Sequence, residues 1–308
     1  MKTRLLALAA AVTLSAISVK PETALACACG CGVFDVGTAA QFPSDEGGVA
    51  SLEYDFLNQN RNWAGSSKAP SADNDDKKVR TDFITAGVQY LFNRSWGINV
   101  KVPYVNRHFE TADSGTTQTF EHFSLGDIRV TGLYTGLSDD LSTGIEFGLK
   151  LPTGRHTLSG FDRDTAIGTG STDALLGVYH RDRFGADSPF VWSVHAKADI
   201  PFRTQDSYRP GNEYTLSAGI SHDAYQLGAG FSAAPLLQLI DSYRVKDTGA
   251  NANPDNTGYE RLVISAGAEF KYAGTALDVN AGYPVFQHVN GDQLVSRFLF
   301  QAVVSRAF

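Results

Sequence analysis

The chain has 308 residues and carries 26 lysine and arginine residues against 33 aspartate and glutamate residues, a formal net charge of −7. An acidic balance of this kind gives no support to nucleic-acid binding. Beyond the first thirty residues no apolar run reaches the roughly 18 residues of a transmembrane helix, which excludes a helical membrane protein. The 30 glycines, 19 phenylalanines and 12 tyrosines are typical of a chain rich in strands and turns.

Residues 1–26 have the pattern of a secretory signal peptide. Two basic residues precede an apolar run that ends at Val19, and the segment closes on the small-residue cleavage pattern Ala24-Leu25-Ala26. We therefore expect an exported protein whose mature chain begins at Cys27.

Residues 27–47 show no sustained alternation and are predicted to form a leader or plug ahead of the strands. All three cysteines lie in this segment, at Cys27, Cys29 and Cys31. Three thiolates spaced two residues apart can turn toward one point, and soft ligands of this kind favour Cu(I) or Zn. The spacing leaves three alternatives open, which are lipidation of Cys27, a disulfide with one odd thiol, and no role beyond that of a tethered tail.

Apolar and polar side chains alternate from about residue 48 to the end of the chain. The stretch Phe190–Phe202 shows this best, because every even position is apolar while the odd positions include Lys197 and Asp199. A period of two predicts a strand with one dry face and one wet face. We predict twelve strands, at residues 51–56, 84–92, 96–104, 127–134, 141–151, 174–178, 190–202, 214–220, 225–231, 262–272, 277–283 and 298–308.

The connections between these strands alternate between short turns and long polar loops. The long loops are predicted at residues 59–78, 110–123, 153–171, 203–212, 242–258 and 287–292. Outer-membrane barrels have an even number of strands, short periplasmic turns and long outer loops. Residues 48–308 therefore predict an all-β, 12-stranded antiparallel transmembrane β-barrel in the lipid of the cell outer membrane. We expect the aromatic Phe308 to be recognised by the outer-membrane assembly machinery.

Charged residues on the wet faces are expected to line the barrel lumen, in a hydrogen-bonded network along the path of a small-molecule solute. The predicted lumen residues are Lys101, Arg107, Asp127, Arg129, Glu146, Lys150, His195, Lys197 and Asp199. Eight-stranded barrels are filled by side chains, whereas sixteen-stranded barrels leave an aqueous channel. Twelve strands therefore predict a narrow and partly obstructed passage.

Prolines recur toward the outer ends of alternate strands. They are Pro103, Pro152, Pro201, Pro235 and Pro284. Because proline donates no ladder hydrogen bond, each one predicts a strand end, a bulge or a kink. Such breaks either narrow the outer rim or open a lateral exit for an apolar solute. Four of the five prolines occupy lumen-facing positions of their strands, which favours a narrowed rim.

Four short motifs lie where predicted strands begin or end. They are Leu125-Gly126-Asp127, Leu149-Lys150-Leu151-Pro152-Thr153-Gly154, Gly168-Thr169-Gly170-Ser171-Thr172-Asp173 and Tyr208-Arg209-Pro210-Gly211-Asn212-Glu213. In these motifs, and over roughly residues 45 to 308, the chain resembles the outer-membrane β-barrels described as components of the MetA pathway of phenol degradation, often called transporters. The resemblance implies passive uptake of small, aromatic or apolar compounds. The cysteine motif of the leader is not part of it.

The sequence leaves functions of different classes open. The first is an outer-membrane channel for passive passage of small organic solutes. The second is a metal-binding outer-membrane protein whose Cys-x-Cys-x-Cys leader captures or relays a thiophilic ion such as copper, and the third is a structural or interaction barrel. We do not predict an enzyme, because the seven histidines are scattered and no ligand pair occurs at two-residue strand spacing.

Overall fold

The computed structural model describes residues 42–43, 46–113 and 115–308. These residues form an all-β structure, which confirms the predicted fold class. The strands are β1 (Gly47–Gly65), β2 (Ser67–Lys68), β3 (Lys78–Asn93), β4 (Trp96–Asp113), β5 (Thr116–Leu125), β6 (Ile128–Tyr134), β7 (Thr143–Leu151), β8 (Ser171–Arg183), β9 (Phe190–Thr204), β10 (Glu213–His222), β11 (Tyr225–Gly228), β12 (Phe231–Arg244), β13 (Tyr259–Tyr272) and β14 (Thr275–Ala307). Short 3₁₀ helices span Ser71–Asn74 and Pro254–Asn256. No helix among the described residues is long and apolar enough to cross a membrane.

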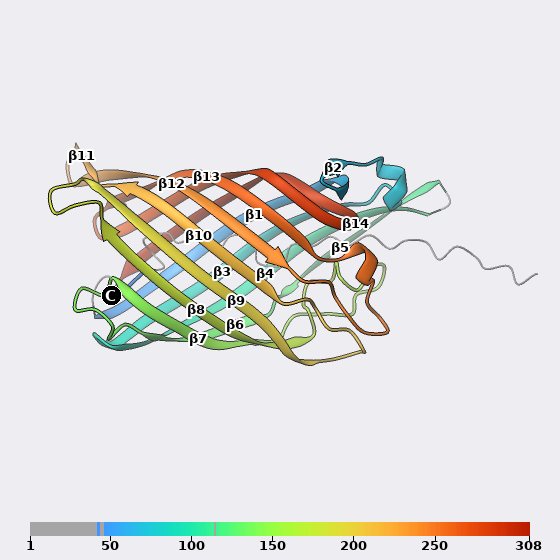
Figure 1. Ribbon diagram of the computed structural model, residues 1–308, viewed down its shortest axis with the longest axis horizontal. Helices are drawn as coiled ribbons and strands as arrows, with labels where there is room; N and C mark the ends of the chain where they lie inside the picture. The colour runs from blue at the N-terminus through green and yellow to red at the C-terminus, as the bar shows by residue number, and fades with distance from the viewer. Residues whose placement is uncertain (1–41, 44–45, 114) are drawn as a thin grey trace, which may run out of the picture.

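The sheet closes on itself as an antiparallel barrel. The circuit runs β1, β3, β4, β6, β7, β8, β9, β10, β12, β13 and β14, and β14 pairs again with β1. Figure 1 shows strongly tilted strands, with the C-terminus and β11 at one end and β2 and β5 at the opposite end. We call these the inner end and the outer end of the barrel.

The strand labelled β14 consists of two wall strands, which we call its two limbs. Residues 275–289 of β14 pair with β13, and residues 289–307 pair with β1. Both pairings are antiparallel, so the chain must reverse between the limbs, and Gly291 with φ 57° lies at the reversal. The two limbs correspond to the last two predicted strands. The long loop predicted at 287–292 is instead a tight turn.

Alternating exposure along the strands separates a lipid face from a lumen face. On β10, Tyr214, Leu216 and Ile220 are exposed, whereas Ser217 is buried. The same pattern recurs around the barrel and leaves an outer surface rich in exposed Leu, Val, Phe and Tyr side chains. A closed barrel with an apolar outer band satisfies its backbone within lipid, because it has no open edge.

Part of the lumen is filled by an apolar cluster. Leu57, Ile240, Val263 and Leu299 are all buried and pack together inside the wall formed by β1, β12, β13 and β14. This cluster limits the open space to the remainder of the lumen.

Some of the predicted prolines mark irregular points of the wall, but the prediction is wrong for Pro235, which lies near the inner end of β12, where β12 pairs with β13 without a register shift. Pro201 pairs with Asp173 beside a register shift between β8 and β9, and Pro284 pairs with Val263 beside another. Near Pro103, β4 changes partner from β6 to β5. The ladder is therefore interrupted where proline supplies no N–H donor.

Two further predicted boundaries are wrong. The loop expected at 110–123 is largely a hairpin of β4 and β5, which pair from Tyr104↔Leu125 to Asp113↔Thr116. Polar side chains stand on both faces of this hairpin at the outer end, so the two-residue apolar period used to recognise strands disappears. The strand expected at 225–231 is also wrong, because β11 forms a small hairpin with the start of β12 around the positive φ angles of Gly228, Ala229 and Gly230. The wall strand that follows β10 is β12.

Candidate functional site

A cavity of about 160 Å³ lies in the outer half of the barrel lumen. We call it the outer cavity. Six of the nine predicted lumen residues line it, and they are Lys101, Asp127, Arg129, Lys150, Lys197 and Asp199. Strand alternation turns these side chains inward from β4, β6, β7 and β9, with Asp127 at the break before β6.

A second cavity, of about 40 Å³, adjoins the first, and we call it the inner cavity. The two share four lining residues, which are Lys101, Arg129, Lys197 and Asp199. Two further predicted residues, Glu146 and His195, line only the inner cavity. The imidazole Nε2 of His195 lies 3.4 Å from Glu146 Oε2. The remaining predicted residue, Arg107, lines neither cavity.

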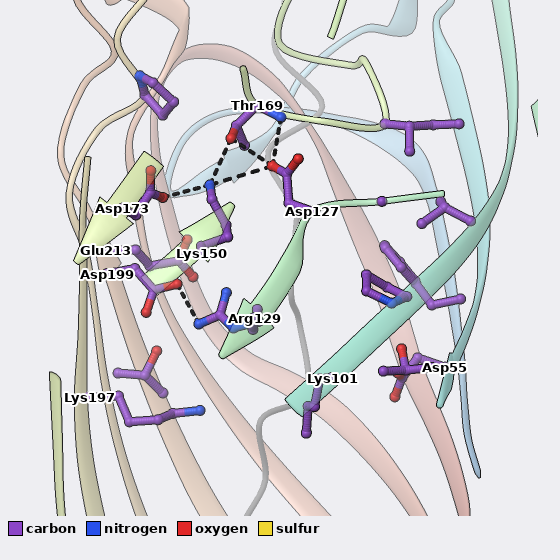
Figure 2. Close-up of a pocket in the computed structure, with 18 of the residues that line it drawn as sticks. Asp55, Lys101, Asp127, Arg129, Lys150, Thr169, Asp173, Lys197, Asp199 and Glu213 are labelled. Atoms are coloured by element: carbon purple, nitrogen blue, oxygen red, sulfur yellow. Dashed lines mark hydrogen bonds and ion pairs between the residues drawn. The ribbon is translucent and has the colours of Figure 1, made fainter. Parts of the chain in front are cut away.

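Asp127 lies at the centre of an ion and hydrogen-bond network above the outer cavity (Figure 2). Its carboxylate accepts hydrogen bonds from the backbone N–H of Gly154 at 2.9 Å and from the N–H and hydroxyl of Thr169 at 3.0 and 2.8 Å. The Lys150 ammonium lies 3.6 Å from Asp127 and 2.5 Å from Asp173. Three of the sequence motifs thus meet at one point, although up to 46 positions separate their residues.

The local chain explains why these groups converge. The wall is interrupted between β5, which ends at Leu125, and β6, which begins at Ile128, so Asp127 is not held in a strand ladder. Gly154 and Gly168 approach each other so closely that a Cβ on either would meet the other's backbone. Only glycine permits this contact, which brings the two ends of the 152–170 loop together.

Arg107 anchors the same loop from the wall. Its guanidinium donates to the carbonyls of Thr165 and Ala166 at 2.7 and 2.8 Å, and to the Thr81 hydroxyl at 3.0 Å. Arg107 is only 2% exposed. Charge-assisted hydrogen bonds are the stronger kind, so Arg107 holds the middle of the loop inside the mouth of the barrel.

A second buried carboxylate joins two other outer loops. Asp247, with no exposed surface, accepts hydrogen bonds from the Tyr208 hydroxyl at 2.5 Å, the Gly211 N–H at 2.8 Å and the Arg244 guanidinium at 2.8 Å. A Cβ at Gly211 would collide with the backbone of Val245, so this motif position also requires glycine.

The loops are also joined to one another across the mouth. Arg163, from the 152–170 loop, stacks over the Tyr208 ring at 4.1 Å, and burial lowers the pKa of its guanidinium. Lys77 binds Asp162 at 3.0 Å. The outer loops therefore form an interlocked cap above the outer cavity.

One wall of the outer cavity is apolar. Phe83 and Val105 face it from β3 and β4, and Ile167 faces it from the 152–170 loop. Phe83 and Val105 occupy lumen-facing positions in the alternation of β3 and β4. A search for apolar residues at lumen-facing positions would therefore have found them. Ile167 lies outside any strand, and no periodic signal marks it.

A residue of the leader lies inside the inner part of the lumen. The Phe42 ring is buried, with its centroid 5.1 Å from that of Tyr179 and 5.9 Å from that of His195. The Arg181 guanidinium donates to the carbonyl of Pro43 at 3.0 Å. Both Tyr179 and His195 are buried lumen residues of β8 and β9, so this part of the leader enters the barrel.

The predicted metal ligands Cys27, Cys29 and Cys31 lie outside the described residues, and the metal site remains a prediction. In the part of the chain that the structure describes, no three His, Cys, Asp or Glu side chains are grouped so as to hold a metal ion.

Comparison with solved structures agrees with the fold. The chain is similar to the COG4313 outer membrane channel from Pseudomonas putida F1, with 14% sequence identity, a TM-score of 0.66, and coverage of 89% of this chain and 100% of that one. It is also similar to the β domain of the Bordetella autotransporter BrkA, with 11% identity, a TM-score of 0.50, and coverage of 86% and 100%. The first of these is an outer membrane channel, and the localisation of this protein is the outer membrane.

No curated protein matches the chain. A family model described as "Putative MetA-pathway of phenol degradation" matches residues 83–287, which is more than half of the chain and includes all four sequence motifs. The chain belongs to this family.

Proposed function

We propose that the protein is a passive outer-membrane channel for small organic solutes with an apolar or aromatic body. The observation that carries the proposal is the outer cavity, whose lining combines the apolar side chains of Phe83, Val105 and Ile167 with charged side chains inside a membrane barrel. A cavity of about 160 Å³ is close to the roughly 150 Å³ apolar cavity that accepts a benzene molecule in another protein. The size and lining therefore suit one aromatic ring.

Membership of the phenol-degradation family and likeness to an outer-membrane channel both support transport. The charged lumen residues described above are engaged in ion pairs and hydrogen bonds that organise the wall and the loops. We therefore propose transport without catalysis.

Solute entry into outer-membrane vesicles tests this function. Vesicles with lipopolysaccharide in their outer leaflet would be prepared with and without the protein, since apolar solutes cross such a leaflet slowly. We expect the protein to speed the entry of radiolabelled benzyl alcohol more than that of arabinose. Equal entry of benzyl alcohol with and without the protein would contradict the proposal.

The leader is proposed to obstruct the inner end of this passage. Phe42 and Pro43 lie against three residues of β8 and β9, below the inner cavity. Replacing Phe42 with alanine should remove the ring that fills this space and raise the single-channel conductance severalfold in a planar lipid bilayer.

The matched control is Phe190→Ala, because Phe190 is also near the inner end of the barrel but is 46% exposed on the outer face. That variant should conduct as the unmodified protein does. If Phe42→Ala leaves the conductance unchanged, the leader does not limit the passage.

A further inference from the structure

We propose that the inner cavity is a hydrogen-bonding subsite, in which His195 accepts a hydrogen bond from the hydroxyl group of an aromatic alcohol whose ring lies in the outer cavity. This inference rests on the proposed transport function and adds a residue that selects among its solutes. His195 belongs to β9, lines the inner cavity and is only 4% exposed.

The imidazole of His195 has unused hydrogen-bonding capacity. Among the residues that the structure describes, neither ring nitrogen makes a hydrogen bond. Nε2 faces the Glu146 carboxylate at 3.4 Å. Buried polar atoms in native proteins nearly always have a partner, and leaving one without a partner costs free energy. A buried imidazole beside a cavity is therefore suited to meet a polar group of the solute.

Glu146 determines which nitrogen of His195 is left as an acceptor. An ionised carboxylate only accepts hydrogen bonds, so it favours the single hydrogen of a neutral imidazole on Nε2, which faces it. Nδ1 then carries a lone pair and needs a donor. A hydroxyl group supplies that donor, whereas a carboxylate in the same place has none and is repelled by Glu146.

Two aromatic rings fix the imidazole without satisfying it. The Tyr179 ring lies nearly perpendicular to it, at 82° and 6.2 Å between centroids, and the Phe42 ring lies 5.9 Å away. The Tyr179 hydroxyl is directed to the carbonyl of Leu141, at 3.5 Å. Rings packed in this way hold the orientation of His195, so its free nitrogen is preorganised for a solute.

The charged side chains between the two cavities favour a neutral molecule. The Arg129 guanidinium lies 2.6 Å from the Asp199 carboxylate, and the Lys101 ammonium lies 3.3 Å from Glu53. An ion that bound here would have to compete with these pairs. A neutral alcohol passes them without breaking either one.

The sizes of the cavities match the two parts of an aromatic alcohol. About 10–15 Å³ of such space holds one water molecule. The inner cavity, of about 40 Å³, therefore accepts a hydroxyl group but not a ring, whereas the outer cavity, of about 160 Å³, suits a ring. Benzyl alcohol has this shape.

A structural role for His195 predicts a different result from a binding role. An imidazole that only packs against Phe42 and Tyr179 would affect the entry of all solutes alike. An imidazole that accepts a hydrogen bond would affect only solutes that carry a donor. Benzyl alcohol and benzyl methyl ether make this comparison, because the ether keeps the ring and the oxygen but has no hydrogen to donate.

The test measures the entry of both solutes, at low concentration, into the lipopolysaccharide-containing vesicles described above. The full chain is compared with His195→Leu and His195→Asn. We expect the ratio of alcohol entry to ether entry to fall about fivefold in His195→Leu, the factor typical of losing one neutral hydrogen bond. Asparagine keeps a side-chain acceptor near the place of Nδ1, so His195→Asn should retain part of the preference. The ratio does not depend on the amount of folded protein, because both solutes use the same barrels.

A spectroscopic measurement follows the imidazole directly in the unmodified protein. With ¹⁵N-labelled histidine in lipid nanodiscs, the Nδ1 resonance of His195 should move when benzyl alcohol is added and stay in place with benzyl methyl ether. The resonance is identified by its absence from the spectrum of His195→Asn.

The matched control is His180→Leu. His180 lies on the neighbouring strand β8, outside the lining of both cavities, and its Nδ1 contacts the Thr143 hydroxyl at 2.7 Å. This variant should keep the preference for the alcohol. An unchanged preference in His195→Leu, or a His195 resonance that does not move with benzyl alcohol, would overturn the inference.

The outcomes separate this subsite from the transport function. If the protein speeds the entry of both solutes at a ratio that His195→Leu does not alter, only the assignment of His195 fails. If the unmodified protein does not speed the entry of benzyl alcohol at all, the proposed function itself fails.

Discussion

Replacing Lys150 with methionine should lower the free energy of unfolding by about 3 kcal/mol, the cost typical of removing one partner from a buried ion pair. The Lys150 side chain is 8% exposed and lies between Asp127 and Asp173, whose side chains are 8% and 5% exposed. Methionine keeps most of the volume but leaves two buried carboxylates without their cation. Guanidinium unfolding of the protein in phospholipid vesicles measures the loss.

The same substitution should loosen the cap. Lys150 also donates to the Thr169 hydroxyl at 2.7 Å, so its removal weakens the network that holds the end of the 152–170 loop. We expect a higher and noisier single-channel conductance, because the loop covers the outer cavity.

Two further variants control for this result. Lys271→Met removes an ion pair whose lysine side chain is 55% exposed, and exposed pairs of this kind contribute only about 0–1 kcal/mol. Adding Asp127→Asn and Asp173→Asn to Lys150→Met removes the unpaired charges and should recover part of the stability. If Lys150→Met lowers the free energy of unfolding no more than Lys271→Met does, the ion pairs of Lys150 with Asp127 and Asp173 are exposed to water and the prediction fails.

An arginine in place of Leu239 should destabilise the barrel by about 2–4 kcal/mol, the cost measured for a cation at the bilayer midplane on the lipid face of such barrels. Leu239 is 48% exposed on the outer face and pairs with Ala218 and Ile264 in the middle of the wall. No water is available there to solvate the guanidinium. The measurement is again unfolding in phospholipid vesicles.

Tyr243→Arg is the matched control, because Tyr243 lies on the same strand and the same face but near the outer rim. A cation near the interface costs about 0–1 kcal/mol, since the long arginine side chain reaches the headgroups. If the two variants lower the free energy of unfolding equally, Leu239 does not face the hydrocarbon.

The wall of the barrel could be predicted because strand alternation is a local property. Leu216 and Ser217 are neighbours in sequence, and a period of two must turn them to opposite faces in any sheet. The prolines could be interpreted for the same reason, because the missing N–H of Pro201 or Pro284 affects its own ladder position. The prediction failed for β5, where polar residues on both faces remove the local signal.

The arrangement of the site could not be predicted in this way. Asp127, Gly154 and Thr169 were recognisable as members of motifs, but nothing in their spacing shows that they contact one another. Their meeting depends on the break between β5 and β6 and on the path of the 152–170 loop. Ile167 and Phe42 enter the lumen from segments without periodicity, so their roles were equally hidden.

Strand alternation alone was enough to show which face of each recognised strand meets lipid and which residues are available to the lumen, because backbone geometry turns successive side chains to opposite faces. The cap and the outer cavity can be seen only in the closed barrel. Closing the sheet brings β4, β6 and β9 together, and that closure sets Lys101, Arg129 and Lys197 in the lining of one cavity, which no local pattern describes.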